Sequence, residues 1–493
     1  MRRPYLRREV NQKVSRYNYP IKMFSCFDAE TWEDSLPLNY ARYGYNIAMR
    51  NGILTDAVGI EDANYDGLDF PNTASDGIRV ESLYLFKYFN NIYSVKNDRV
   101  IALRDKKVYQ AEVIGADFRE IQGMEFDTND ITFLNFYAQG TDQLIAISKN
   151  GGMKIYNGSS VTDVPSCPAL SDACVHFGRI YGVTEQSNKV YFSALSDPTN
   201  WNHSLYEGGY ITMTDEGGLL KRIISFKDNL YIFREFAIYK LSALADQTDF
   251  VLSKVYIGNN KVCPNSITVC NDRIIFLADD GFYSFDGYSV KKILRNIFPL
   301  IEDTSYAVGC YFNHKYYLAV KMKTDGVKVG DEYYSELKNN ALFIYDTGTG
   351  DMGIFRGADV RGFMPISTER INKLFVWFNN FVRFNGIGVI TDTGRCFNRK
   401  LQKKWVSPKT NFETLSKDKV LKKLYISSTA PMTLTASLEE DYNYYLSASH
   451  KAQMIPINRR ADKIGLVLWT DQDNFAVTGM LLEFDLIRRR TDE

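Results

Sequence analysis

The stretch IISFKDNLYIFREFAIYKL, at residues 223–241, holds three short apolar runs separated by two polar turns. The first turn, Lys227-Asp228-Asn229, divides IISF from LYIF, and Arg234-Glu235 precedes the third run, FAIYKL. Short runs rich in Ile, Tyr and Phe between polar turn residues are typical of β-strands joined by tight turns. The stretch therefore predicts three antiparallel strands.

The same strand–turn–strand pattern recurs along most of the chain. Clear copies lie at 267–287, 308–320 and 369–385, and weaker copies lie at 84–103, 136–156 and 175–195. Their first turns are roughly 40 to 60 residues apart, near the period of propeller blades built from four strands. The repeat indicates a radial array of small sheets, in which neighbouring blades bury each other's faces and leave only short edges.

We therefore expect an all-β chain with a β-propeller at residues 81–400. Seven blades fit the copies best, and six or eight are the alternatives. Residues 1–80 lack the repeat and are expected to form a basic N-terminal arm and a lead-in segment, with room for one short helix within 34–55. Residues 401–493 are expected to form a basic linker and a small C-terminal β-sandwich, because alternating runs return without a pattern of helix length.

The charge of the chain is balanced overall but uneven locally. The 59 basic and 59 acidic residues give no net charge, whereas a dedicated nucleic-acid coat has a basic excess. Residues 1–25, however, carry seven basic residues against Glu9 alone. This arm is either a solvated segment or a docking element for an acidic partner surface or DNA, and we expect it to be disordered until a partner binds. The docking residues we predict are Arg2, Arg3, Arg7, Arg8, Lys13 and Arg16.

Motifs that carry chemistry are missing from the sequence. The four histidines are scattered, and no zincin, nucleophile-elbow or P-loop motif occurs. Asp62, Asn64 and Asp66 resemble the first half of an EF-hand loop, but Thr73 occupies the position of the bidentate Glu. We predict no catalytic residue, metal ligand or cofactor. The absence of a long apolar window also predicts no membrane span.

The loop Ser-Asp-Pro-Thr-Asn-Trp at residues 196–201 is predicted to be structural. Pro198 fixes its own φ and restricts Asp197 to extended geometry. We expect Trp201 to pack back on a blade and to hold the loop in place.

Several of these segments also resemble a known family. They are LPLNYARYGYNIAMRNGILTDAVGI at 36–60, VYFSALSDPTNWN at 190–202, and the stretches 226–241 and 266–293. In this order they resemble the bacteriophage virion propellers known as tail nozzle, tail hub or packaged-DNA stabilisation proteins. The weak first blades and the long basic arm depart from that pattern, which leaves the docking partner of the arm open.

The resemblance implies a homo-oligomeric ring, for which six copies are expected, in the tail or neck of a virion assembled in a bacterial cytoplasm. Its partners would be the adaptor, the portal and the fibres, and DNA would pass through it without covalent chemistry. A near-neutral conduit suits this role, since a strongly basic lumen would hold the phosphate backbone. The alternatives are a propeller glycosidase or sugar-binding protein acting on host polysaccharide, and a cellular scaffold. A glycosidase would need two carboxylates about 5–10 Å apart in a cleft.

Overall fold

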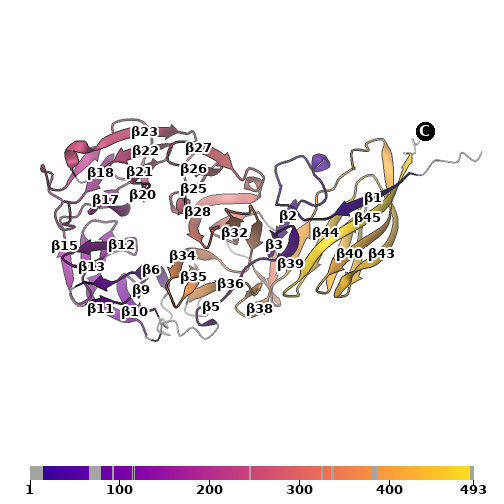
Figure 1. Ribbon diagram of the computed structural model, residues 1–493, viewed down its shortest axis with the longest axis horizontal. Coiled ribbons are helices and arrows are strands. Elements are labelled where there is room, and N and C mark those ends of the chain that lie inside the picture. The colour runs from indigo at the N-terminus through magenta and orange to yellow at the C-terminus, as the bar shows by residue number, and fades with distance from the viewer. Residues whose placement is uncertain are drawn as a thin grey trace, which may run out of the picture.

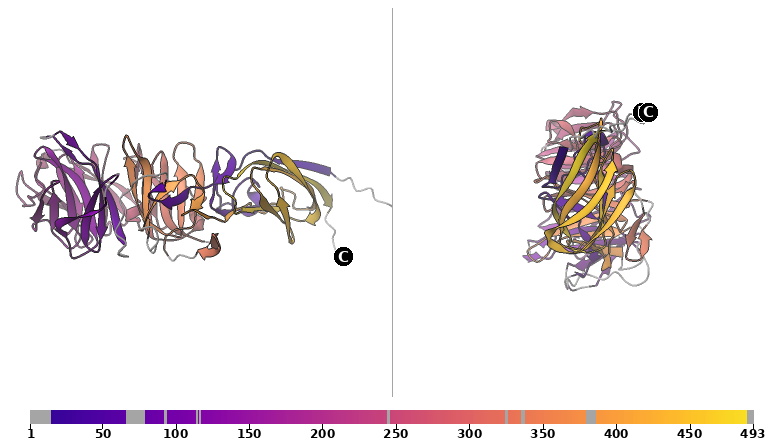
Figure 2. Two further views of the ribbon diagram at one scale, coloured as in Figure 1. Left: turned by 90° about the horizontal axis from the view of Figure 1, so that it is seen from below. Right: turned by 90° about the vertical axis from the view of Figure 1, so that its right-hand side faces the viewer.

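The computed structural model describes residues 15–488 apart from 66–78, 92–93, 114, 116, 244–245, 324–325, 335–337 and 379–385. Within these ranges the chain forms strands and turns and contains no α-helix. Figure 1 shows a ring of small sheets at one end of the molecule and a β-sandwich at the other. The views in Figure 2 show that the two parts form one elongated body. Short 3₁₀ turns occur at η1 (Glu33–Ser35), η3 (Gln247–Asp249), η4 (Pro264–Ser266) and η5 (Phe298–Leu300).

The stretch at 223–241 forms three neighbouring strands of one blade, as predicted. Strand β20 (Leu220–Phe226) pairs with β21 (Asn229–Arg234), which pairs with β22 (Ala237–Ser242). The turn between β20 and β21 has positive φ at both Lys227 (46°) and Asp228 (58°), as a two-residue type I′ turn requires. The local sequence therefore sets both the strands and their register.

Seven blades of four antiparallel strands surround the central opening within the described ranges, so the expectation of a seven-bladed propeller is confirmed (Figure 1). Four of the blades are separate sheets, and the other three belong to larger sheets. In each blade the first strand named lies innermost. Blade 1 is β6 (Val80–Phe86), β9 (Arg99–Arg104), β10 (Lys107–Glu112) and β11 (Arg119–Glu125). Blade 2 is β12 (Ile131–Ala138), β13 (Thr141–Ser148), β14 (Met153–Tyr156) and β15 (Val161–Val164). Blade 3 is β16 (Asp172–His176), β17 (Arg179–Val183), β18 (Lys189–Phe192) and β19 (Gly209–Thr212).

The other blades continue the same order. Blade 4 adds β23 (Val251–Ile257) outside β22. Blade 5 is β24 (Thr268–Cys270), β25 (Arg273–Ala278), β26 (Gly281–Phe285) and β27 (Val290–Ile293). Blade 6 is β28 (Ile301–Phe312), β29 (Lys315–Met322), β32 (Ala341–Asp346) and β33 (Met352–Phe355). Blade 7 is β34 (Val360–Ser367), β35 (Asn372–Phe378), β36 (Ile387–Thr391) and β5 (Gly59–Asp62). Shorter pairs accompany them: β7 (Phe89–Asn90) with β8 (Val95–Lys96), β30 (Val327–Val329) with β31 (Glu332–Tyr334), and β37 (Arg395–Cys396) with β38 (Arg399–Lys400).

Strand β5 closes the ring. It precedes blade 1 in sequence but pairs with β36 of blade 7, from Asp62 opposite Gly388 to Gly59 opposite Thr391. A Cβ atom on Gly59 would lie 2.4 Å from Thr393 Oγ1 and 2.8 Å from the Arg395 carbonyl oxygen, so only glycine fits at this close approach. Hydrogen bonds between the two ends of the propeller sequence therefore remove its free edge.

The high aromatic content is explained by the packing between blades. Six of the seven pairs of neighbouring blades enclose a separate apolar cluster between them. Between blades 4 and 5, for example, the rings of Phe233 and Phe276 pack with their centroids 5.6 Å apart. The cluster between blades 5 and 6 differs, because it continues into the interior of the sandwich. The propeller and the sandwich therefore share one hydrophobic core.

The sandwich consists of two antiparallel sheets. One sheet contains β1 (Ser15–Ile21), β45 (Ala476–Arg488), β40 (Lys417–Ser428) and β43 (Ser449–Ala461). The other contains β2 (Tyr43–Tyr45), β39 (Lys403–Val406), β44 (Gly465–Thr470), β41 (Met432–Ser437) and β42 (Asp441–Leu446). The predicted C-terminal sandwich is thus present, but it takes two of its strands from the N-terminal segment.

A hairpin made of β3 (Ile47–Arg50) and β4 (Ile53–Asp56) joins the two parts. Strand β3 pairs with β33 at the outer edge of blade 6, and β4 pairs with β45 of the sandwich. The result is a single ten-stranded sheet that runs from the propeller into the sandwich. The turn at Asn51-Gly52 has positive φ at both residues, and the helix expected within 34–55 is wrong, because this segment is occupied by η1 and by strands.

The expected domain limits also need correction. Residues 1–80 are not a separate unit, since their described part supplies β1 and β2 to the sandwich, β5 to the propeller, and the hairpin between them. The basic stretch after residue 401 is not a linker, since β39 and β40 are sandwich strands. The limits of the propeller and the sandwich are set by pairing between strands far apart in sequence, and such pairing cannot be read from composition.

The arm was expected to be disordered in isolation over residues 1–25, and this is wrong for its described part. Strand β1 pairs with β45 of the same chain, from Ser15 opposite Leu486 to Ile21 opposite Met480. Burial of Ile21 and Phe24 in the core supplies the driving force. Residues 1–14 lie outside the described residues.

Candidate functional site

A polar cleft of about 680 Å³ opens between blades 6 and 7, next to the sandwich. One wall comes from the β28–β29 turn and the start of β29, with Phe312, Asn313 and Lys315. The opposite wall comes from the start of β35 and from the segment that follows β36. Asn474, from the loop between β44 and β45, completes the cleft. The site therefore depends on the way the sandwich is joined to the ring.

Carboxamide, hydroxyl and charged groups dominate the lining. The amides are Asn313, Asn372, Asn398 and Asn474, and the charged residues are Glu61, Lys315, Lys373, Asp392 and Arg395. Tyr65, Phe312, Thr391 and Thr393 add hydroxyl and aromatic surface. This is a lining for a polar ligand, since an apolar one would cover these exposed amides and leave them without hydrogen bonds.

Glu61 forms part of the cleft and is fully engaged. The Thr393 hydroxyl donates to Oε1 at 3.1 Å, and the backbone N–H of Asn398 donates to Oε2 at 2.6 Å. The other cleft carboxylate, Asp392, is 82% exposed and lies 3.7 Å from Arg50 Nη2. Glu61 therefore holds the loop after β36 in position, while Asp392 stands in solvent at the rim.

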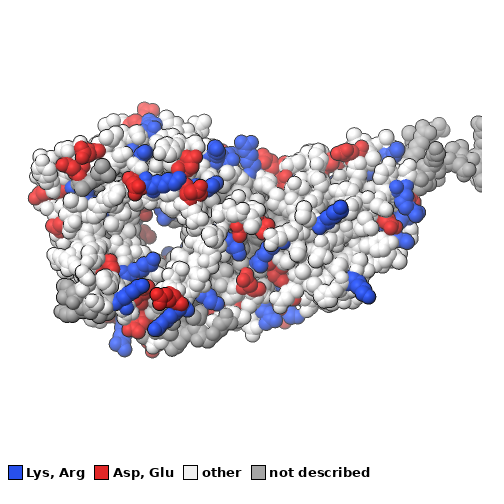
Figure 3. Space-filling model, viewed as in Figure 1, with Lys and Arg blue, Asp and Glu red and all other residues white. Residues whose placement is uncertain are grey.

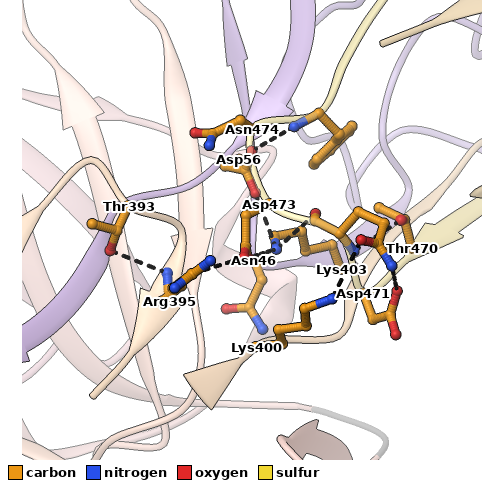
Figure 4. Close-up of polar contacts among 12 residues, drawn as sticks. Asn46, Asp56, Thr393, Arg395, Lys400, Lys403, Thr470, Asp471, Asp473 and Asn474 are labelled. Atoms are coloured by element: carbon orange, nitrogen blue, oxygen red, sulfur yellow. Dashed lines mark hydrogen bonds and ion pairs between the residues drawn. The ribbon is translucent and has the colours of Figure 1, made fainter. Parts of the chain in front are cut away.

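A buried ionic network lies directly behind the cleft (Figure 4). Lys403 has a side chain only 1% exposed, and its Nζ lies 3.1 Å from Asp56 Oδ1 and 3.0 Å from Asp473 Oδ1. It also donates to the Gln472 carbonyl oxygen at 2.9 Å. The three charged side chains come from β39, from β4 and from the loop before β45, so the network ties together three segments at the joint.

Burial raises the pKa of Asp56 to about 6, although Lys403 and the backbone N–H of Phe475 act in the opposite direction. The Phe475 N–H donates to Asp56 Oδ2 at 2.9 Å. The desolvation of this carboxylate is therefore only partly offset by its partners. Loss of the Lys403 cation would leave the desolvated Asp56 carboxylate without its ionic partner.

Arg395 connects the ionic network to the cleft. Its Nε donates to Asp473 Oδ2 at 2.7 Å and its Nη1 donates to Asn398 Oδ1 at 2.9 Å, while the side chain stays 39% exposed. Two fixed partners hold the guanidinium plane in one orientation. The cleft thus presents a preorganised donor group to an incoming ligand.

The predicted structural loop lies elsewhere, between β18 and β19 of blade 3. Asp197 Oδ1 accepts hydrogen bonds from the Thr199 N–H at 2.9 Å and from the Thr199 hydroxyl at 2.6 Å. Trp201 Nε1 donates to the Pro198 carbonyl oxygen at 3.0 Å, and the ring packs against the apolar cluster shared by blades 2 and 3. The prediction that Trp201 packs back on a blade is confirmed.

Trp201→Ala is expected to lower the unfolding free energy by about 2 kcal/mol, since it removes a large, partly buried ring from that cluster. Chemical denaturation of the full chain measures the change. Trp32→Ala is the matched control, because Trp32 is 74% exposed and should change stability little. Equal effects of the two substitutions would contradict the structural role of the loop.

Of the docking residues predicted in the arm, Arg16 alone lies within the described residues, and it is not part of the cleft lining. Arg2, Arg3, Arg7, Arg8 and Lys13 lie outside the described residues. Arg16 lies on β1, and its Nε donates to Asp485 Oδ1 of β45 at 3.4 Å. Arg16 therefore has a partner within its own chain.

Asp62 and Asp286 of the aspartate-rich turns bond to their own turns, whereas Asp66 and Thr73 of the EF-hand-like stretch lie outside the described residues. Asp62 Oδ1 accepts from the Asn64 N–H at 2.9 Å, and the N–H groups of Ser289 and Tyr288 lower the pKa of Asp286 to about 2. Within the described ranges no group of three or more His, Cys, Asp or Glu side chains is arranged to hold a metal ion. No helix of that part of the chain is long and apolar enough to cross a membrane.

Sequence reasoning missed both the cleft and the ionic network. Lys403 belongs to the basic stretch 398–423, for which the sequence favours a linker or an exposed strand pair. One local signal was available: Lys403 and Trp405 alternate on a strand, so they share the face that carries the fully buried indole ring. The partners of Lys403, by contrast, lie too far away in sequence to be paired with it by inspection.

Comparisons with known proteins add similarities of fold only. No family model matches the chain, and no curated protein matches it. The AfRom2 CNH domain is similar with a TM-score of 0.38 and 10% identity, over 66% of this chain and 96% of that chain. BBS1N, in a structure of its complex with ARL6DN, is similar with a TM-score of 0.39 and 8% identity, over 66% of this chain and 96% of that chain. At these values the similarities carry no inference about function.

Proposed function

We propose that this chain is a structural component of a bacteriophage virion, in the tail or neck ring through which DNA leaves the capsid. The order of the sequence motifs from 36–60 to 266–293 supports this function. In the proposal several copies, with six expected, stand side by side below the portal and adaptor and give the fibres a platform. The ring retains packaged DNA and carries no covalent chemistry.

One structural observation carries the proposal furthest. Ser15 pairs with Leu486, so the two ends of the described chain, Ser15 and Arg488, lie together at the end of the sandwich remote from the propeller (Figures 1 and 2). Beyond both ends the sequence contains arginines: four of them stand in 1–14, and Arg489 and Arg490 stand in 489–493. The sandwich is thereby suited to dock on an acidic partner surface while the propeller faces away from it.

The distribution of charge also agrees with a passive conduit. Figure 3 shows basic and acidic side chains interspersed on the face that is drawn, including around the opening of the ring. Charges are also paired between the innermost strands of neighbouring blades, as Arg361 of β34 is with Glu81 of β6. A surface of mixed charge does not hold a polyanion strongly.

The test is a deletion of residues 1–14, which leaves β1 in place. The truncated protein should fold with unchanged thermal stability and fail to enter virions, as judged by mass spectrometry of particles from a complemented mutant.

Two full-length variants separate the effect of the arm's charge from the effect of its length. Replacement of Arg2, Arg3, Arg7, Arg8 and Lys13 by Gln should abolish incorporation, whereas replacement of the four arginines by Lys should retain it. Normal copy number in the truncated or the Gln variant would overturn the assignment.

A further inference from the structure

We propose that the cleft between blades 6 and 7 binds a neutral oligosaccharide. This inference does not rest on the proposed function, because it concerns a solution property of the isolated chain. It rests on the lining of the cleft, on the way its charges are paired, and on its size.

The lining matches the hydrogen bonding of sugar hydroxyls. A hydroxyl group both donates and accepts, and a carboxamide offers two donors and one acceptor oxygen. Four carboxamides reach the cleft from four different segments. Their mutual contacts leave most of this capacity free: Asn372 Nδ2 donates to Asn313 Oδ1 at 3.4 Å, and Asn398 Oδ1 accepts from Arg395.

The charges favour a neutral ligand over an anion. Lys315, Lys373 and Arg395 are cationic, but Arg395 is already paired with Asp473. Glu61 and Asp392 stand on the same lining. A phosphate or sulfate placed between the cations would also meet these two carboxylates. A polyhydroxylated neutral ligand can accept from the cations and donate to Asp392 without that repulsion.

Aromatic and aliphatic surface is present beside the polar groups. Phe312 and Tyr65 are half-buried in the lining and offer ring surface to the apolar C–H face of a sugar. The volume of about 680 Å³ lies within the range of roughly 300–1,000 Å³ usual for ligand sites. The cleft therefore combines the two features that sugar recognition needs, which are amide-type hydrogen bonding and ring surface.

The geometry suggests two ways to remove the site without disturbing the core. Lys315→Ala with Asn372→Ala removes polar groups from both walls, at the first residues of β29 and β35. Thr391→Trp fills the cleft from the end of β36. Arg273→Ala is the matched control, because Arg273 is the first residue of β25, forms an ion pair with the exposed Asp272 next to it, and lies outside the cleft.

The experiment uses the purified full chain and saturation-transfer NMR with a panel of soluble oligosaccharides. The panel contains neutral hexose and N-acetylhexosamine oligomers, their sulfated or phosphorylated counterparts, and inorganic phosphate. We expect transfer to at least one neutral member, loss of transfer with Thr391→Trp, an affinity about tenfold lower with the double alanine variant, and no change with Arg273→Ala. Thermal unfolding checks the folding of each variant. If Thr391→Trp proves unfolded, the affinity of the double alanine variant tests the cleft in its place.

Three outcomes would overturn the proposal: no transfer to any neutral member, binding of the anionic members alone, or neutral binding that the cleft variants leave unchanged. Each is distinguishable from failure of the virion assignment, which is measured by particle incorporation. A chain that enters virions and binds no sugar would refute only the cleft.

Discussion

Lys403→Met is expected to lower the unfolding free energy by about 4 kcal/mol at pH 8. The substitution keeps an unbranched side chain of similar length but removes the cation that lies within 3.1 Å of Asp56 and 3.0 Å of Asp473. Two largely buried carboxylates would then remain at the joint, with Arg395 as the nearby cation for Asp473. Urea denaturation of the full chain measures the loss.

The deficit should shrink on acidification, and this identifies its cause. The pKa of Asp56 is already raised to about 6 in the presence of Lys403, and removal of Lys403 raises it further. In both proteins the pKa of Asp56 is higher in the folded than in the unfolded state, so protonation stabilises the folded state as the pH falls. In wild type this gain begins near pH 6, whereas in Lys403→Met it begins at a higher pH and is therefore larger by pH 5. The gap between Lys403→Met and wild type should therefore be smaller at pH 5 than at pH 8.

Lys404→Met is the control for this experiment, because Lys404 is the next residue of β39, is only half-buried and contacts the Tyr43 ring. It should change stability little at either pH. A deficit for Lys403→Met that stays the same at pH 5 and pH 8 would show that packing, rather than unpaired carboxylates, causes the loss.

Deletion of residues 1–25 is expected to cost the sandwich at least about 4 kcal/mol, whereas deletion of residues 1–14 costs nothing measurable. The longer deletion removes Ile21 and Phe24, which are 2% and 3% exposed, and the strand β1 that covers the edge of β45. Phe24 also makes an edge-to-face contact with Trp405 at 5.3 Å between ring centroids. Hydrogen exchange of amides in β40 and β45 should accelerate in the longer deletion and remain unchanged in the shorter one.

Equal protection of β40 and β45 in both deletions would contradict the role of β1 in the sandwich. The comparison also bears on the assembly experiment. A protein without residues 1–25 would be excluded from particles by loss of folding as well as by loss of docking, so only the deletion of residues 1–14 tests the arm.

The propeller could be predicted because each blade is encoded locally. Strands β20 and β21 are joined by Lys227-Asp228, both with positive φ as in a type I′ turn, and the same kind of turn recurs at Asn313-His314. The period of the apolar runs then follows from the blade itself. Strand β5, in contrast, has four residues and pairs with β36 more than 300 residues later, and nothing in its own sequence identifies that partner.

The cleft could not be predicted for a related reason. Asn313 and Asn372 occupy ordinary turn and strand-start positions, and turn chemistry alone accounts for an asparagine there. They face one cleft only because blades 6 and 7 are neighbours and because the sandwich places Asn474 beside them. Convergence of this kind depends on ring closure and on the hairpin β3–β4, both of which result from tertiary pairing.

The pairing of β1 with β45 sets the order in which the chain can fold during its synthesis. Strands β5 and β36 are both available once residue 391 has left the ribosome, so the ring can close at that stage. Strand β1 must wait for β45, which ends at Arg488. At usual elongation rates the time between synthesis of residue 391 and synthesis of residue 488 is roughly 5–20 s. During that interval Ile21 and Phe24 have no core to enter, and the β1 strand of one nascent chain is open to capture by the β45 strand of another.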